Sequence, residues 1–296
     1  MADLRGVAYV VIEDLDLTPF GYRIPQFSCE VMRRILDTPE DGFDSIRGVA
    51  LVPGTGEYSL ANTPVRFEID KGVTKIANIN NDEGRADIEV AIDNLTAEVP
   101  ACKAVALVVS WFGSDLRVGE CIIEPKVEQD TLDGSEMPWS VSSQGRTGAS
   151  VVSQIDGRPG FGGTPADRSV IEGIETLRAA GQAVMFYPFI LMDIRDGNGL
   201  LNPWTGSGEQ PPVPWRGRIT TSLAPGVSGT TDKTAAAGVE VSTFMGTVAL
   251  SDFAIVDGSV IYSGPDEWSY RRFILHYAHL CVAAGGVDSF CIGSEM

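Results

Sequence analysis

The sequence predicts an α+β amino-terminal region, mostly antiparallel β, over residues 1–100, followed by an α/β domain over residues 101–296. Three observations support this division. Short strand-like runs separated by turn residues fill the first part, near-continuous apolar runs appear in the second, and amphipathic helical segments lie between those runs. Buried strands joined by helices are expected to be parallel. Four of them fit either a doubly wound sheet or the first half of a βα-barrel.

The amino-terminal region alternates strand-like runs with turn signals. The runs are residues 7–12, 27–35, 46–52, 65–69 and 86–92. Within the last of them, D-I-E-V-A-I has the alternation of a half-exposed strand. Small antiparallel regions more often serve assembly than catalysis, so we expect an assembly domain here.

Four apolar runs in the second part are the expected parallel strands. They cover residues 104–109, 149–155, 182–192 and 287–292. The irregular segment 115–138 is expected to add one strand near residues 121–123. The stretch 194–266 has no clear period and is rich in Gly, Pro, Ser and Thr, which predicts a long loop.

Two helices are expected between these strands. Thr164 and Pro165 form a capping pattern before an apolar stripe, and Gly181 ends the first helix. The second runs from about residue 267 to residue 284, with apolar residues at i, i+3, i+4 and i+7.

Composition and motifs exclude several classes of function. The 22 Lys and Arg against 40 Asp and Glu give a net charge of −18, which disfavours a nucleic-acid-binding surface. Five widely spaced cysteines without C-x-x-C predict reduced thiols and synthesis in the cytoplasm. With two histidines in the chain, no metal site is expected. No 18-residue apolar run and no signal-peptide layout is present, so we expect no membrane span. No cofactor is expected.

Three local features have a functional and a plainer interpretation. The glycine-rich segment 157–163 joins a strand to a helix but lacks both phosphate-binding glycine patterns, which favours a flexible loop. Ser110 lacks the G-x-S-x-G elbow of a serine hydrolase. His276 and His279 fall away from the apolar stripe of their helix, which favours solvated or interface histidines over ligands or bases.

Acidic residues follow three of the expected strands. Asp156 follows the second strand, Asp193 the third and Glu295 the fourth. Acids at the carboxyl ends of barrel strands are candidate catalytic groups, and glycoside hydrolysis uses two carboxylates. Glu295 is the best candidate for the general acid, with Asp193 and Asp156 assisting. Capping of helices and solvation of loops is the plainer explanation for Asp156 and Asp193.

Three tryptophans are candidate platforms for a sugar ring. Trp111 closes the first apolar strand, while Trp204 and Trp215 lie in the expected long loop. Aromatic faces stack on sugars, so together with the acids they indicate carbohydrate chemistry.

Several segments resemble phage tail proteins: the first resembles a stretch found in phage tail proteins, and the later ones resemble the large tail-tip, or baseplate hub, protein of gene transfer agents and related siphophages. The matching segments are P-F-G-Y-R-I-P-Q-F-S at 19–28, V-S-W-F-G at 109–113, F-Y-P-F-I-L-M-D at 186–193, P-W-R-G-R-I at 214–219, Y-R-R-F-I-L-H-Y-A-H-L at 270–280 and I-G-S-E at 292–295. The later segments are similar to the TIM-barrel-like domain of that family. Tyr22, where the family favours Asn, is a minor departure.

The resemblance implies a structural component of the distal tail in the virion. Its glycoside-hydrolase-like barrel would meet a host envelope glycan, and its partners would be other tail and baseplate proteins, with a homo-oligomer such as a trimer expected. The family protein is far longer, so we expect here the amino-terminal portion only, with the barrel truncated after about four strands.

The sequence leaves three functions open. The first is a structural tail-tip protein, the second an active glycosidase acting on peptidoglycan or a surface glycan, and the third a sugar-binding module. The third explains neither residues 1–100 nor the resemblance. We expect this chain alone to lack glycosidase activity, and to be poorly soluble without a partner because half a barrel exposes strand edges.

Overall fold

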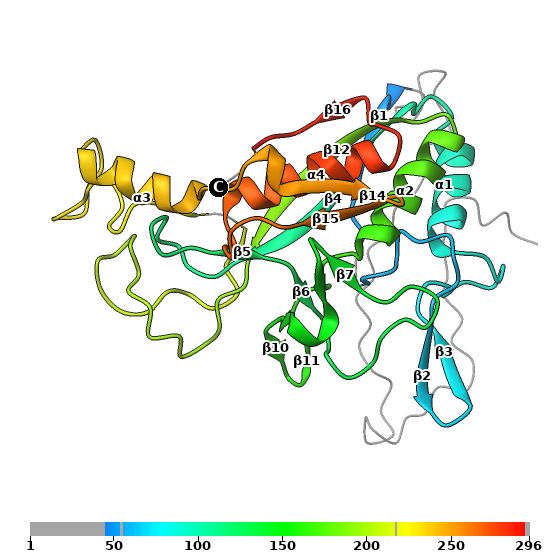
Figure 1. The fold of residues 1–296 in the computed structure, drawn as a ribbon, viewed down its shortest axis with the longest axis horizontal. Coiled ribbons are helices and arrows are strands. Elements are labelled where there is room, and N and C mark those ends of the chain that lie inside the picture. Colours follow the sequence, from blue (N-terminus) through cyan, green and yellow to red (C-terminus); the bar gives the residue numbers. More distant parts are fainter. Residues whose placement is uncertain (1–44, 54–55, 217, 294–296) are drawn as a thin grey trace, which may run out of the picture. The chain divides into compact units, whose positions relative to one another are not determined.

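The largest element of the computed structural model is a six-stranded sheet (Figure 1). Its parallel strands are β1 (Gly48–Leu51), β4 (Ala104–Gly113), β12 (Ala183–Met192) and β16 (Ser289–Phe290). They lie side by side in chain order, because β4 pairs with β1 and β12, and β12 pairs with β16. Two short antiparallel strands complete the sheet. β5 (Ile123–Glu124) pairs with the last two residues of β4, and β13 (Trp215–Arg216) pairs with the last two residues of β12.

The structure describes residues 45–53, 56–216 and 218–293. All of them fall in one compact unit, residues 42–296. The strands expected at residues 7–12 and 27–35 lie outside the described residues. The observed architecture is a mixed α/β fold built on a parallel sheet.

The β4–β12 pair organises the core. The two strands are in register over ten residue pairs, from Ala104 opposite Ala183 to Gly113 opposite Met192. Alternate side chains of β4 are fully buried, including Leu107 and Trp111. The apolar runs in the sequence account for the length of both strands, but the structure buries one face more fully than the other: the burial of β12 alternates, and Met185 is 38% exposed.

Three helices follow the parallel strands. They are α1 (Asp87–Glu98), α2 (Asp167–Ala179) and α4 (Tyr270–Ala283). The first packs against α2, α2 packs against α4, and both α2 and α4 pack against β12. Ser269 caps α4 by accepting a hydrogen bond from the amide of Arg272.

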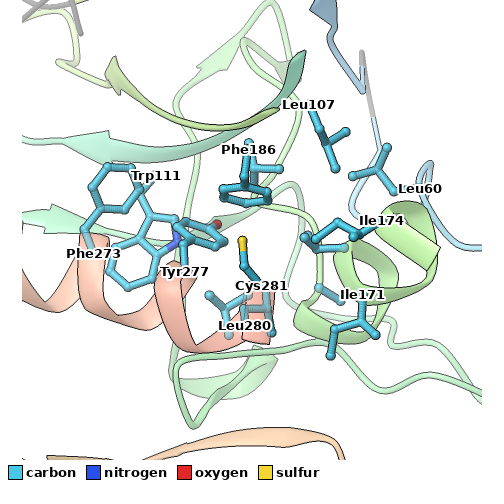
Figure 2. Close-up of a cluster of buried hydrophobic side chains, with 14 of the residues drawn as sticks. Leu60, Leu107, Trp111, Ile171, Ile174, Phe186, Phe273, Tyr277, Leu280 and Cys281 are labelled. Carbon is cyan, nitrogen blue, oxygen red and sulfur yellow. The ribbon is translucent and has the colours of Figure 1, made fainter. Parts of the chain in front are cut away.

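Buried side chains from these helices and strands form one core (Figure 2). Trp111, Phe273 and Tyr277 lie together on one side of the close-up, with Phe186 near them. Figure 2 shows Ile174 of α2 on the other side, among aliphatic residues. An aromatic cluster therefore joins α4 to the sheet, and aliphatic packing joins α2 to it.

The remaining elements are short. They are β2 (Arg66–Asp70), β3 (Val73–Ile76), β6 (Lys126–Val127), β7 (Ser140–Val141), β8 (Gln144–Gly145), β9 (Ser150–Val151), β10 (Gln154–Ile155), β11 (Arg158–Pro159), α3 (Ala235–Met245), β14 (Phe253–Val256), β15 (Ser259–Tyr262), and single 3₁₀ turns at Arg146–Gly148 and Leu250–Asp252. Most pair as hairpins, whereas β6 and β9 pair in parallel.

Two expectations for the first hundred residues are wrong. The run 86–92 is the start of α1, not a strand: Ile88 and Ile92 are buried four residues apart, which is a helical spacing. The run 46–52 yields β1, but β1 pairs in parallel with β4 and so belongs to the main sheet. The fold does not divide near Ala101 within the described residues.

Three expectations for the second part also need correction. The run 149–155 is not a sheet strand, because it splits into β9 and β10, which pair elsewhere. The stretch 194–266 contains α3 and the β14–β15 hairpin. Thr164 does not cap α2: the helix begins after Ala166, with no side-chain cap, and the Thr164 hydroxyl donates to the Ser110 carbonyl oxygen.

The described cysteines are free thiols. Cys102, Cys121 and Cys281 are buried, and Cys291 is partly exposed. Burial raises the pKa of Cys121 to about 11 and that of Cys281 to about 12. Among the described helices, none has the length and apolar character to cross a bilayer.

Candidate functional site

The carboxyl ends of β4 and β12 form the candidate site. Gly113 and Met192 end the two strands opposite each other, and the chain continues from both ends as loops. An acid follows each strand, Asp115 after β4 and Asp193 after β12. In α/β proteins this edge of a parallel sheet is where ligands bind.

Asp193 is buried in a charge cluster rather than free in solvent. Its side chain is 0% exposed, and its Oδ2 lies 3.0 Å from Nζ of Lys126, whose side chain is 8% exposed. The backbone amide of Ser153 donates to both carboxylate oxygens, at 3.2 and 3.1 Å. The backbone amide of Asp193 donates to the Gly113 carbonyl, which holds Asp193 beside the last residue of β4.

Lys126 reaches this position because two contacts hold its backbone. The Lys126 amide donates to the Thr164 hydroxyl at 3.2 Å, and the Thr164 amide donates to the Lys126 carbonyl at 2.7 Å. The same hydroxyl is anchored to β4 through Ser110. Glu124, on β5, places Oε1 3.7 Å from the Lys126 Nζ. A lysine thus lies between two carboxylates in a largely buried setting.

The acid after β4 is also neutralised. Arg117 contacts Asp115 with two nitrogens, at 3.0 and 2.6 Å. Gln210 donates to the same carboxylate at 2.7 Å and accepts from the Leu116 amide. Asp115 therefore ties the loop after β4 to the segment near Gln210.

Two cavities open beside the cluster. One, of about 830 Å³, is lined mainly by Val151–Ile155 and Pro212–Val213, with Arg195 and Asp196 at its side. The other, of about 330 Å³, includes Asp193, and Arg195 and Asp196 line it too. The edge of the sheet is therefore accessible, although the lysine–aspartate contact itself is buried.

Asp156, another of the predicted acids, is not part of this cluster. Asp156 lies at the turn of the exposed β10–β11 hairpin, with a φ of 50°, so it does not follow a sheet strand. Glu295 lies outside the described residues. Of the two predicted acids that the structure describes, Asp193 lies at the carboxyl edge of the main sheet and Asp156 does not.

The predicted sugar platforms are dispersed. Trp111 is fully buried and packs edge-on to Trp268 with ring centroids 5.5 Å apart, so it offers no face to a ligand. Trp204 is 42% exposed, its Nε1 donates to the Arg218 carbonyl, and the Arg218 guanidinium lies 5.2 Å from its ring. The backbone of Trp215 lies on β13, and its side chain is outside what the structure describes.

His276 is a core residue, contrary to the expected solvated or interface position. It is 0% exposed, and its Nε2 lies 2.9 Å from Asp167 Oδ1 at the start of α2. The ring also packs on Trp111, with centroids 5.6 Å apart. His279 stacks on Phe253 of β14 and contacts the Leu275 carbonyl. Both histidines join elements of the fold.

Sequence reasoning missed Lys126 and a second buried charge cluster. Arg146 contacts Glu57 through both terminal nitrogens, and it also contacts Asp133 and Tyr58. Desolvation by burial raises the pKa of Glu57, despite the neighbouring guanidinium. No local motif marks the central ion pair of either cluster, because Lys126 and Asp193 are 67 residues apart and Arg146 and Glu57 are 89 residues apart. Among the described residues, no group of His, Cys, Asp and Glu has an arrangement suited to a metal ion.

Comparison with known protein families finds a match in the carboxyl-terminal part of the chain. Residues 268–296 match the family described as the GTA TIM-barrel-like domain, where GTA stands for gene transfer agent. This finding relates the chain to gene transfer agent proteins. No curated protein matches the chain.

The matched segment contains α4 and β16. Within it, Arg272 lies between two rings, 3.6 Å from the Trp268 centroid and 3.9 Å from that of Tyr262. Its guanidinium also donates to Ser142. Burial lowers the pKa of Arg272 to about 10. The family similarity thus falls on the helix that anchors the core.

Proposed function

We propose that the chain is a structural component of the tail tip or baseplate of a phage or gene transfer agent. It would carry a glycoside-hydrolase-like barrel that faces the host envelope. The observation that carries this proposal is the family match at residues 268–296, which coincides with α4 and with the last described strand of the parallel sheet.

The strand order supports a barrel rather than a doubly wound sheet. β1, β4, β12 and β16 are neighbours in chain order, whereas a doubly wound sheet reverses direction at a switch point. The successive helices α1, α2 and α4 pack one against the next, as helices do on the outside of a barrel. We infer that these elements form the first half of a TIM-barrel-like domain.

The state of the acids favours a structural role over catalysis. Glycosidases place two carboxylates about 5 to 10 Å apart with the substrate between them. Asp193 is neutralised by Lys126, and Asp115 by Arg117. A general acid or nucleophile must be free to contact the substrate, and neither of these carboxylates is. The active glycosidase is the second candidate, supported by Asp193 lining a cavity.

The proposed partners follow from the same function. Other tail and baseplate proteins, and further copies of this chain, for example in a trimer, would contact it in the virion tail after synthesis in the bacterial cytoplasm. A host envelope glycan would be the external ligand.

Location in purified particles tests the proposal. Particles from cells that express an epitope-tagged chain should show gold label at the distal end of the tail, and a tagged capsid protein should label the head. Loss of the gene should leave particles that lack a complete tail tip. Particles that assemble and infect normally without the chain would refute the structural role.

A further inference from the structure

The cluster at the end of β12 has the composition of a reactive centre as well as that of an ion pair. Lys126 supplies an amine, Asp193 a carboxyl group 3.0 Å away, and Glu124 a second carboxylate 3.7 Å from the same nitrogen. The three side chains are 8%, 0% and 15% exposed, respectively. Charged groups this deeply buried are costly, and a reaction that removes both charges relieves that cost.

We propose that Lys126 and Asp193 become joined by an intramolecular isopeptide bond, with Glu124 carrying the proton. The inference goes beyond the proposed function, since a covalent cross-link is a property of the chain wherever it assembles. It assigns a chemical modification to a pair that would otherwise be a buried salt bridge.

The reaction is a condensation that needs no other reactant. One proton passes from the Lys126 ammonium to the Asp193 carboxylate with which it is in contact, and the free amine then attacks the Asp193 carboxyl carbon. A C–N bond forms, a C–O bond breaks, and one water departs. Glu124 takes a proton from the attacking nitrogen and returns it to the leaving hydroxyl, so it ends as it began. One ammonium and one carboxylate become a neutral amide and water, and the charge balances.

The surroundings favour each step. Burying a charged pair is costly, so a product without charges is favoured at this largely buried position. The Ser153 amide donates to both Asp193 oxygens, so it can also stabilise negative charge that develops on the carboxyl oxygen during attack. Thr164 holds the Lys126 backbone in place, so the amine and the carboxyl group are already positioned next to each other before they react.

Apolar packing helps to keep water from the pair. Phe112 is opposite Glu124 in the β4–β5 pairing, and it forms a buried cluster with Val152 and Phe161. Val152 directly precedes Ser153 and donates its amide to the Val127 carbonyl. Residues flanking each member of the reactive set are therefore buried, and exclusion of water favours the amide over its hydrolysis.

The chain contains a matched pair that lacks these conditions. Lys233 Nζ lies 3.7 Å from Asp232, and the Lys233 side chain is 90% exposed. This pair is solvated, so both charges are stable there. It should remain unlinked in the same sample in which residues 126 and 193 are joined.

The intact mass of the purified, fully denatured chain tests the proposal. We expect the mass to be lower than that of the sequence by one water, and digestion to yield a branched peptide that joins residues 126 and 193. An intact mass equal to that of the sequence, with separate peptides for the two residues, would overturn the proposal. The readout requires neither a virion nor a glycan, so its failure is distinct from failure of the proposed function.

Three variants define the chemistry. Lys126→Arg keeps a positive charge but cannot form the amide, so its mass should equal that of its sequence. Asp193→Asn should lose ammonia instead of water and give the same product mass as the wild type. Glu124→Gln should slow the formation of the bond by about a hundredfold or more, as expected for loss of a proton carrier. A Lys126→Arg chain that still loses one water would place the modification elsewhere and refute the assignment.

Discussion

Two buried charge clusters in this molecule differ in what their cations can do. Arg146 contacts Glu57, which lies in the segment between β1 and β2, and Lys126 contacts Asp193 at the end of β12. The cation is nearly inaccessible in both, with side-chain exposures of 2% for Arg146 and 8% for Lys126. Burial alone therefore does not distinguish them.

The arginine cluster is a network with many partners. Arg146 donates to the Gln129 carbonyl at 2.7 Å and to the Tyr58 hydroxyl at 3.0 Å, and Tyr58 donates to Asp133. Glu57 also accepts from the Glu128 amide. A guanidinium stays charged and is a poor nucleophile, so this cluster can act only as a structural centre.

The lysine cluster has few partners and a nucleophile. The Lys126 Nζ contacts two carboxylates, and a single backbone amide, from Ser153, supports Asp193. Lysine loses its proton far more readily than arginine when buried. The comparison teaches that the type of cation, rather than its depth, decides whether a buried pair is only structural or also reactive.

The largest expected effect comes from Lys126→Arg. This variant keeps the charge but removes the cross-link, which encloses the chain between residues 126 and 193. By analogy with the closure of a loop of that length by a disulfide, we expect a loss of about 4 kcal/mol and a fall in Tm on the order of 10 °C. Scanning calorimetry measures it, and an unchanged Tm would mean that the wild type gains nothing from a covalent link.

A second large effect is expected from Arg146→Met. The variant leaves Glu57 buried without its cation, and the free energy of unfolding should fall by about 3 kcal/mol. Urea denaturation followed by tryptophan fluorescence measures this change. Arg66→Met is the matched control, because the Arg66–Glu136 pair is exposed and its removal should leave stability almost unchanged. Equal losses in the two variants would show that burial does not strengthen the Arg146 cluster.

A smaller effect concerns pH. The pKa of Glu57 is raised above its ordinary value of 4.5 by desolvation, so the folded state holds the proton more tightly than the unfolded state. The stability from this group is complete below the ordinary pKa and is lost as pH rises through the folded pKa. Relative to Glu57→Gln, the wild type should therefore lose stability as pH rises from about 4 to neutral.

Urea titrations of both proteins at a series of pH values test this sign. Asp133 acts in the opposite direction, since hydrogen bonds from Trp139 and Arg146 outweigh desolvation and lower its pKa. Asp133 is present in both proteins, so its own titration contributes stability in the opposite direction in each of them. A difference that grows in favour of the wild type with rising pH would contradict the assigned shift of Glu57.

The sequence was sufficient for the main strands and the last helix. Continuous apolar runs predicted β4 and β12, and apolar residues at helical spacing predicted α4. These patterns extend over ten or more residues, so each indicates one type of element. The strand predicted at residues 86–92 is wrong because a short segment can fit both strand alternation and helical spacing. Burial of Ile88 and Ile92 on one side of α1 stabilises the helix there.

The site was less predictable than the fold. Asp193 was found because it directly follows an obvious strand. Lys126 was not, because it belongs to an irregular segment and meets Asp193 only through tertiary folding. Asp156 was misplaced since its expected strand breaks into a hairpin. His276 lies away from the apolar stripe of its helix, but packing against Asp167 and Trp111 buries it.

The most direct test of a structural rather than catalytic carboxyl edge is turnover of peptidoglycan by the purified chain. Release of dye from labelled peptidoglycan should be no greater with the wild type than with Asp193→Ala, and lysozyme should serve as the positive control. We expect no turnover from either protein, because Asp193 is committed to Lys126. Turnover by the wild type that is lost in Asp193→Ala would contradict the account and assign this edge to catalysis.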